Sequence, residues 1–333
     1  MRGALASAGM IMIILLVGCT PDPGSPVPDP TLSGPSTASG PPSGTPSRSR
    51  VTPTPSSPSP SPPRARAEVS ARRMVADVQR LAGDIGPREA TSKAFHEAAD
   101  LVEERFRELG FRTRRTAVKV PAGDSWGTPV RAGTSANVIA DTPGLDPARD
   151  HVVIGAHLDT VARAPGAEDN ASGIAVLLEL ARLAGLDPPE VPIRFVAFGA
   201  EEPRGDGDAL HHFGSRQLVA GLSTAERSAI RGMVSLDRVG VPADRVPVCR
   251  AGSRGTALQD QLRDAGRAAK ISTRACEDRA SDHWSYQKAG IPAVRLGKIA
   301  YAGYHSPDDV PSVVDDDQLA RAARLLWSWL GRS

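Results

Sequence analysis

The chain has 333 residues and a formal net charge of +2, and it contains no long run of Lys or Arg. This balance argues against nucleic acid as a partner. Half of the 30 prolines lie between Pro21 and Pro63, in a stretch with almost no apolar residues, so we predict a disordered linker there. Roughly 265 residues remain for folding, which is enough for one large domain with its own core.

The first predicted element is an export signal at residues 1–19. Arg2 gives a positive start, residues 4–17 are almost continuously apolar, and the run stops at Cys19. This arrangement resembles a bacterial lipobox, in which the cysteine is lipidated and becomes the mature N-terminus. An uncleaved anchor helix is the alternative, although the run is short for a bilayer core of about 20 residues. Both interpretations place the domain outside the cytoplasm.

The next segment, residues 20–66, is the Pro/Ser/Thr-rich linker. Chain of this composition favours extended polyproline II, so it would act as a tether between the anchor and the folded domain. A lipidated Cys19 would hold the domain at the cell membrane, and a cleaved form would be secreted.

Helical and strand patterns alternate through residues 67–333. Apolar residues at three- and four-residue spacing predict helices at Ala71–Leu81, Ser92–Leu109, Ile174–Leu183, Thr256–Ala269 and Gln318–Leu330. Short apolar runs predict strands at Ala136–Ala140, His151–Ala156, Ile193–Gly199, Met233–Leu236 and Ile291–Leu296. This alternation predicts an α/β fold, a three-layer α/β/α sandwich with a mixed, mainly parallel central sheet.

Two cysteines, Cys249 and Cys276, lie inside this domain in short strand-like runs. Outside the cytoplasm they can form one disulfide, and two separate buried thiols are the alternative. A metal site is not expected at these residues, because no CxxC spacing accompanies them.

Metal-binding residue types stand where several predicted strands end. His157 and Asp159 follow one strand, Glu201 and Glu202 follow the next, and Asp237 follows a third. Active sites of such sheets gather beyond the carboxyl ends of the strands. Imidazoles and carboxylates that converge there are a ligand set that suits zinc.

Six segments, in this order, resemble the M28 family of metallopeptidases, which contains secreted bacterial aminopeptidases. They are Gly155–Asp159, Asp169–Gly173, Ala200–Glu202, Leu236–Asp237, Ser281–His283 and Tyr304–Asp309. Any one of them is a weak signal, whereas six in the expected order are specific. The resemblance covers the chain from about Val69 onward.

The resemblance implies a site with two zinc ions. In it, His157 and Asp237 bind one ion, Glu202 and His305 bind the other, and Asp169 bridges the two. Asp159 is expected to accept a hydrogen bond from His157 and so fix its tautomer.

The resemblance also implies the catalytic roles. Glu201 would be the general base, and the hydroxyl of Tyr304 would donate to the oxyanion. We therefore predict a two-zinc exopeptidase that releases N-terminal amino acids from peptides. A glutaminyl cyclase-like or a carboxypeptidase- or dipeptidase-like zinc enzyme of the same fold is an alternative. A non-catalytic binding lipoprotein is another.

Other polar residues receive supporting roles. We expect His211 and His212 to line the cleft, Asp282 and His283 to support the site or pack, and Asp308 and Asp309 to shape the turn after His305. One departure from the family pattern is Arg238, which stands where an apolar residue is usual after the ligand Asp. It brings a cation near the site, where it can alter substrate preference.

Overall fold

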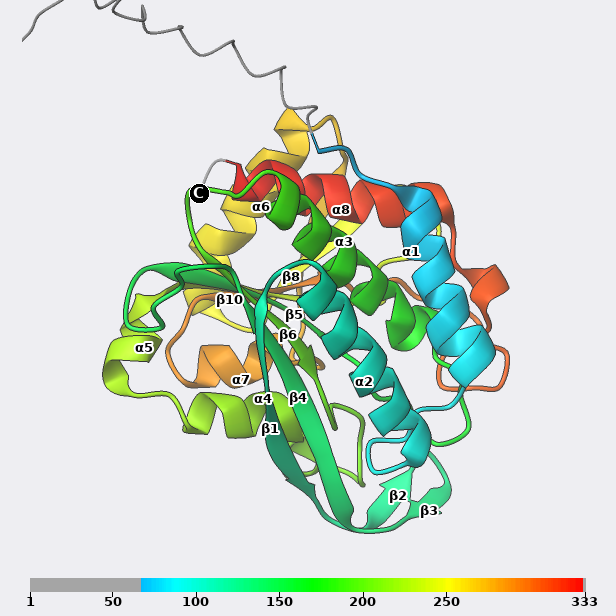
Figure 1. Cartoon of the computed structure of the whole chain (residues 1–333). Coiled ribbons are helices and arrows are strands. Elements are labelled where there is room, and N and C mark those ends of the chain that lie inside the picture. Colours follow the sequence, from blue (N-terminus) through cyan, green and yellow to red (C-terminus); the bar gives the residue numbers. More distant parts are fainter. Residues whose placement is uncertain (1–66, 332–333) are drawn as a thin grey trace, which may run out of the picture. The chain divides into compact units, whose positions relative to one another are not determined.

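The computed structural model describes residues 67–331 (Figure 1). The predicted export signal, Cys19 and the whole linker therefore lie outside the described residues. Within residues 67–331, none of the helices has the length and apolar character needed to cross a membrane.

An eight-stranded sheet in the order β1-β4-β6-β5-β7-β10-β8-β9 forms the centre of the domain. Its strands are β1 (Arg112–Val120), β4 (Gly133–Asp141), β5 (His151–His157), β6 (Ile193–Phe198), β7 (Ile230–Asp237), β8 (Val246–Arg250), β9 (Thr273–Glu277) and β10 (Ala293–Gly297). Strands β6, β5, β7 and β10 run parallel, while β1, β4 and β8 pair antiparallel with their inner neighbours. A separate hairpin joins β2 (Gly123–Ser125) to β3 (Thr128–Val130).

Helices cover both faces of this sheet (Figure 1). On one face lie α1 (Ala71–Val78), α2 (Lys93–Glu108), α3 (Ser172–Leu186), α6 (Thr256–Ala268) and α8 (Asp316–Leu330). On the other lie α4 (Phe213–Ala220) and α7 (His283–Lys288), and the short α5 (Thr224–Ala229) leads into β7. Because side chains alternate along a strand, Ile154 enters the larger core and its neighbour Val153 enters the smaller one. The predicted three-layer sandwich with a mixed sheet is confirmed.

Every predicted helix and strand in the described range is present, with ends that differ by a few residues. The first helix leaves α-helical geometry at Val78 and continues as a wider turn over Gln79–Ile85. Strand β1 was not predicted, because its sequence RTRRTAVKV is too basic to read as part of a core. It is an edge strand, where charged side chains protect the open edge from pairing with other chains.

Cys249 and Cys276 form a disulfide, so that alternative is confirmed. The two residues are direct partners across the parallel pair of β8 and β9. The bridge fastens the edge strand β9 to its only neighbour in the sheet.

The four central parallel strands set the position of the site. Strand β5 ends at His157, β7 ends at Asp237, and β6 ends at Phe198, three residues before Glu201. Carboxyl ends of parallel strands meet at one edge of a sheet, so these side chains converge there although the sequence separates them widely.

Candidate metal centre

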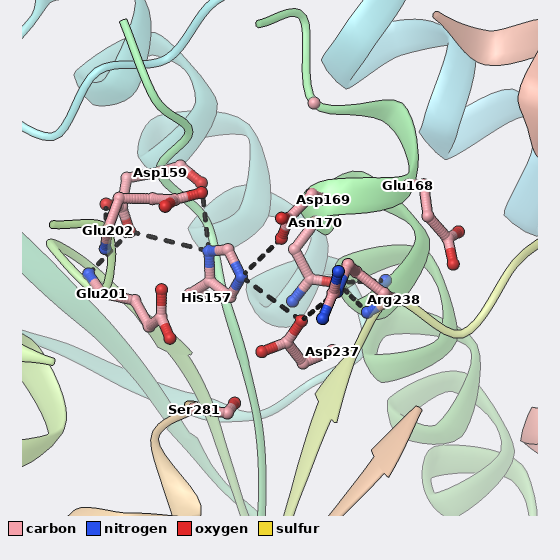
Figure 2. A network of polar contacts seen from close by, with 12 residues as sticks. His157, Asp159, Glu168, Asp169, Asn170, Glu201, Glu202, Asp237, Arg238 and Ser281 are labelled. Atoms are coloured by element: carbon pink, nitrogen blue, oxygen red, sulfur yellow. Dashed lines mark hydrogen bonds and ion pairs between the residues drawn. The ribbon is translucent and has the colours of Figure 1, made fainter. Parts of the chain in front are cut away.

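The carboxylate of Asp169 lies between two histidines. Its Oδ1 atom is 3.1 Å from Nε2 of His157, and its Oδ2 atom is 3.2 Å from Nε2 of His305. His157 also approaches Oδ1 of Asp237 at 3.8 Å, and His305 approaches Oε2 of Glu202 at 3.2 Å. Dashed lines in Figure 2 join the ring of His157 to Asp169 and to Asp237. Asp169 therefore belongs to two sets of possible metal ligands. One set is His157, Asp169 and Asp237, and the other is His305, Asp169 and Glu202.

These separations fit zinc. Zinc binds imidazole nitrogen and carboxylate oxygen at about 2.0–2.2 Å with tetrahedral geometry, which places the ligand atoms roughly 3.3–3.6 Å apart. The donor separations of 3.1–3.8 Å bracket that range. The donor atoms of His157, Asp169 and Glu202 also all lie within 4.8 Å of one another. The residues present therefore fit zinc.

The buried charge of the centre also favours cations. Burial raises the pKa of Glu202 to about 7, because His305 compensates only in part. Burial alone would lower the pKa of His305, but Glu202 and Asp169 raise it to about 10. Carboxylates gathered out of water are stable only with positive partners.

The loop that carries Asp169 is held by Asp309. The carboxylate of Asp309 accepts the backbone N–H groups of Glu168 and Asp169 at 2.8 and 3.1 Å and the hydroxyl of Tyr301 at 2.8 Å. The Asp169–Asn170 peptide is cis. Asp309 was expected to shape only the turn after His305, whereas it links that turn to the loop of Asp169.

Asp159 accepts a hydrogen bond from His157, as expected, but through its backbone carbonyl and not through its side chain. The Nδ1 atom of His157 lies 3.1 Å from the backbone carbonyl of Asp159, whereas the side-chain oxygen is 3.9 Å away. The carboxylate instead accepts the backbone N–H groups of Glu201 and Glu202 at 3.0 and 3.1 Å. The tautomer of His157 is thus fixed by a carbonyl, and the Asp159 side chain orients the Glu pair.

Asp237 is held by Arg295, a residue that the sequence did not single out. The guanidinium of Arg295 donates to Oδ1 of Asp237 at 2.7 Å. Burial alone would raise the pKa of Asp237, but Arg295 and His157 bring it well below its usual range. The available signal in the sequence was an Arg inside the otherwise apolar run of strand β10.

Glu201 lies beside the centre. Its carboxylate is within 4.8 Å of donor atoms of His157 and Asp237, close enough to be considered a ligand. However, its Oε1 atom is 3.2 Å from Nε2 of His212, so that oxygen already has a partner. Burial raises the pKa of Glu201 to about 8. This arrangement suits a group adjacent to the ions that exchanges protons.

His212 was expected to line the cleft and instead touches Glu201. It is 3% exposed, and its Nδ1 atom has no hydrogen-bond partner among the described residues. Its backbone N–H donates to the carbonyl of Glu201 at 2.9 Å. The buried carboxylate of Asp282 also lies near Glu201 and His212, and these neighbours affect its pKa, which burial raises to about 7. His211, by contrast, lies against the ring of His212 with 5.6 Å between ring centroids, and His283 bonds the carbonyl of Asp278.

Aromatic rings form the mouth of the site. The ring of Tyr304 stacks on His305 with 3.7 Å between ring centroids, and Trp126 of the β2–β3 turn packs edge-on against His305 at 4.5 Å. Tyr304 and Trp126 are 39% and 45% exposed, so both can contact a ligand from solvent.

Left-handed backbone conformations concentrate here. Trp126, Ala200, His212, Arg238 and His305 all have φ between 51° and 57°. Such conformations are costly for residues other than glycine and persist where the surroundings enforce them, typically at functional sites.

Comparisons with known proteins show the family of this chain. Residues 137–330 match the model of Peptidase family M28. The chain is 32% identical over 189 residues to Aminopeptidase YwaD of Bacillus subtilis, covering 53% of this chain and 40% of the relative. It is 30% identical over 210 residues to the Probable lipoprotein aminopeptidase LpqL of Mycobacterium tuberculosis, covering 56% and 39%. The chain thus spans about two fifths of the length of these two relatives.

Solved structures share the fold. A zinc aminopeptidase from Bacillus subtilis superposes with a TM-score of 0.71 at 19% identity, covering 80% of this chain and 95% of that one. A glutaminyl cyclase from Fimbriiglobus ruber superposes with a TM-score of 0.67 at 24% identity, covering 80% and 96%.

Proposed function

The chain belongs to peptidase family M28, and from this premise we propose that it is a two-zinc aminopeptidase that releases N-terminal amino acids from peptides. In this proposal His157 and Asp237 hold one zinc ion, Glu202 and His305 hold the other, and Asp169 bridges them. When bound, the two ions polarise the scissile carbonyl and lower the pKa of the attacking water.

One observation supports the proposal most strongly. The two oxygens of Asp169 face two different histidines at 3.1 and 3.2 Å, and each histidine has a second carboxylate beside it. A carboxylate placed in this way could bind one ion with each of its oxygens, whereas an imidazole does not readily bind two metals at once.

The remaining residues supply proton transfer and charge stabilisation. Glu201, adjacent to the ligand Glu202, accepts the proton of the water and delivers it to the leaving amine. Tyr304, at the mouth of the site, donates its hydroxyl to the oxygen that becomes negative. The carboxylate of Asp159 holds Glu201 and Glu202 in position by accepting hydrogen bonds from their backbone N–H groups.

The activity is tested with purified, zinc-supplemented protein on aminoacyl p-nitroanilides and on an N-acetylated counterpart. The proposal predicts chelator-sensitive release from the free amine and none from the blocked substrate. Equal release from both would indicate that the free N-terminus is not recognised, and the aminopeptidase assignment would then be wrong.

A glutaminyl cyclase-like activity is the second candidate, because cyclases superpose on this fold as well as aminopeptidases do. Mass spectrometry of a peptide that begins with glutamine separates the two reactions. Hydrolysis shortens the peptide by one residue, whereas cyclisation releases ammonia and leaves its length unchanged.

We also propose that the enzyme acts outside the cytoplasm, held by a lipidated Cys19. The apolar N-terminal run that ends at Cys19 supports this location, and the name of the mycobacterial relative describes that protein as a probable lipoprotein. Cys19→Ala should abolish the incorporation of a labelled fatty acid into the protein. Equal labelling of the variant and the wild type would contradict lipid anchoring at Cys19.

A further inference from the structure

Arg238 directly follows the proposed ligand Asp237 and has a guanidinium group with unused hydrogen-bonding capacity. Its Nε atom is 3.8 Å from Oδ1 of Asp237, too far for a hydrogen bond, and its Cζ atom lies 4.3 Å above the centre of the Tyr304 ring. Among residues 67–331, no oxygen accepts a hydrogen bond from this guanidinium.

The other buried arginines of the site differ from Arg238. The side chain of Arg88 donates to the carbonyls of Leu81, Gly86, Leu158, Pro165 and Gly166. Arg295 donates to the carboxylates of Asp237 and Asp278. These two groups are structural, because their donors are used within the protein. The side chain of Arg238 is only 12% exposed, yet its N–H groups remain available to donate hydrogen bonds to a ligand.

The backbone fixes the direction of Arg238. Its φ is 57°, its N–H donates to the side chain of Asn170 at 3.3 Å, and its carbonyl accepts from Ile299 at 3.4 Å. The imidazole of His305 stacks on the Tyr304 ring at 3.7 Å, so the guanidinium must cover the opposite face of that ring. Figure 2 shows Arg238 beside Asp237 and Asn170.

The charge at this position points to an anionic ligand. The carboxylates of Asp169, Glu202 and Asp237 would be engaged by the cations that they hold, which would neutralise their negative charge. Once those carboxylates are engaged by metal, Asp237 and Asp169 no longer balance Arg238, and a mostly desolvated guanidinium requires another partner. The planar fork of Arg is matched by a carboxylate, which accepts two parallel hydrogen bonds.

We propose that Arg238 binds a carboxylate of the substrate close to the scissile bond, so that the enzyme prefers peptides carrying a negative charge there. This inference rests on the proposed peptidase function. Two groups offer the same chemistry: the side chain of an N-terminal Asp or Glu, and the free C-terminus of a dipeptide. Tyr304 supports the guanidinium and, in the proposed mechanism, contacts the reacting carbonyl, so the carboxylate lies within about one residue of the reacting atoms.

The experiment measures binding without turnover, by calorimetry on the zinc-loaded Glu201→Gln protein. One arm compares Glu-Leu amide with Gln-Leu amide, and the other compares Leu-Gly with Leu-Gly amide. The carboxylate-bearing peptide should bind about tenfold tighter or more in one of the two arms, which also identifies the source of the carboxylate. Introducing Arg238→Met into the Glu201→Gln protein should bring the ratio of the two dissociation constants in that arm close to one. Arg238→Lys should restore part of the preference.

Lys298→Met is the matched control. Its backbone N–H bonds to the carbonyl of Asp237, but its ammonium pairs with Asp278 at 3.2 Å. The preference should survive in this variant. A ratio near one in both arms, a ratio that persists in Arg238→Met, or an equal loss in Lys298→Met would overturn the assignment. Failure of the wild type to hydrolyse any peptide would refute only the aminopeptidase activity, because the binding ratios do not depend on it.

Discussion

The Nε2 atom of His212 lies 3.2 Å from Oε1 of Glu201, and both side chains are buried. The contact leaves one oxygen of Glu201 for the water and holds the other. His212 is itself fixed, because its backbone N–H bonds to the carbonyl of Glu201. We therefore interpret His212 as a positioning residue for the general base.

Replacing His212 tests that interpretation. His212→Leu removes the donor and should lower kcat by about tenfold or more, since a hydrogen bond to a charged group contributes roughly 1.5–3 kcal/mol. KM and zinc content should change little. His212→Gln keeps an N–H donor and should recover most of the lost kcat. Equal kcat values for the Leu and Gln variants would show that packing, and not the hydrogen bond, is what matters.

The proposed general base gives a second prediction. Glu201→Gln keeps the shape of the side chain but cannot accept a proton, so kcat should fall by about 10²–10⁴-fold. Zinc content, measured by elemental analysis, should stay near that of the wild type. A variant with normal turnover would remove Glu201 from this role, and a variant that loses zinc would make it a ligand.

Substitutions of the proposed metal-binding residues should distinguish the two zinc sites. His305→Ala removes a donor of one set only, so we expect it to lower the zinc content by about one ion per chain. Asp169→Ala affects both sets and should lower zinc content further. Elemental analysis after dialysis measures the number of zinc ions per chain in each variant. If His305→Ala retained the wild-type content, His305 would not be a ligand.

Zinc binding should depend on pH. Without metal, the carboxylates around His305 outweigh its burial and raise its pKa to about 10, so it is protonated at neutral pH. The ion must displace that proton, and apparent zinc affinity should therefore rise as the pH rises towards 10. Calorimetry in buffers of different ionisation enthalpy measures the protons released. Affinity that is independent of pH between 6 and 9 would be inconsistent with this prediction.

The disulfide should stabilise the fold. Cys249 and Cys276 are 27 residues apart, and closing a loop of that size destabilises the unfolded chain by roughly 3.5 kcal/mol. Chemical denaturation of a variant with both cysteines replaced by Ser should show a loss of that order. Because the bridge lies in β8 and β9, away from the Glu pair, zinc content should be retained. A stability equal to that of the wild type would indicate that the bridge constrains nothing.

The sequence predicted the central strands and the ligand-bearing loops because both have local signals. Strand β5 is a run of buried residues that ends in His157, and Asp237 ends β7 in the same way. Strand β1 could not be predicted, because its pattern of Arg and Lys makes sense only once it is known to pair with β4 at an edge.

The supporting contacts of the site depend on residues far apart in the chain. Arg295 meets Asp237 from a neighbouring strand, 58 residues away, and Asp309 reaches the N–H of Asp169 across 140 residues. His212 reaches Glu201 only because an irregular segment returns to bond it. Spacing along the sequence carries no information on such contacts, so they require the three-dimensional structure.

Diffraction from crystals of the zinc-soaked protein, with anomalous data collected at the zinc absorption edge, tests the shared role of Asp169 most directly. We predict two anomalous peaks about 3.5–4 Å apart, one between His157 and Asp237 and one between His305 and Glu202, with one carboxylate oxygen of Asp169 towards each. A single peak, or two peaks that do not share Asp169, would contradict the two-zinc centre.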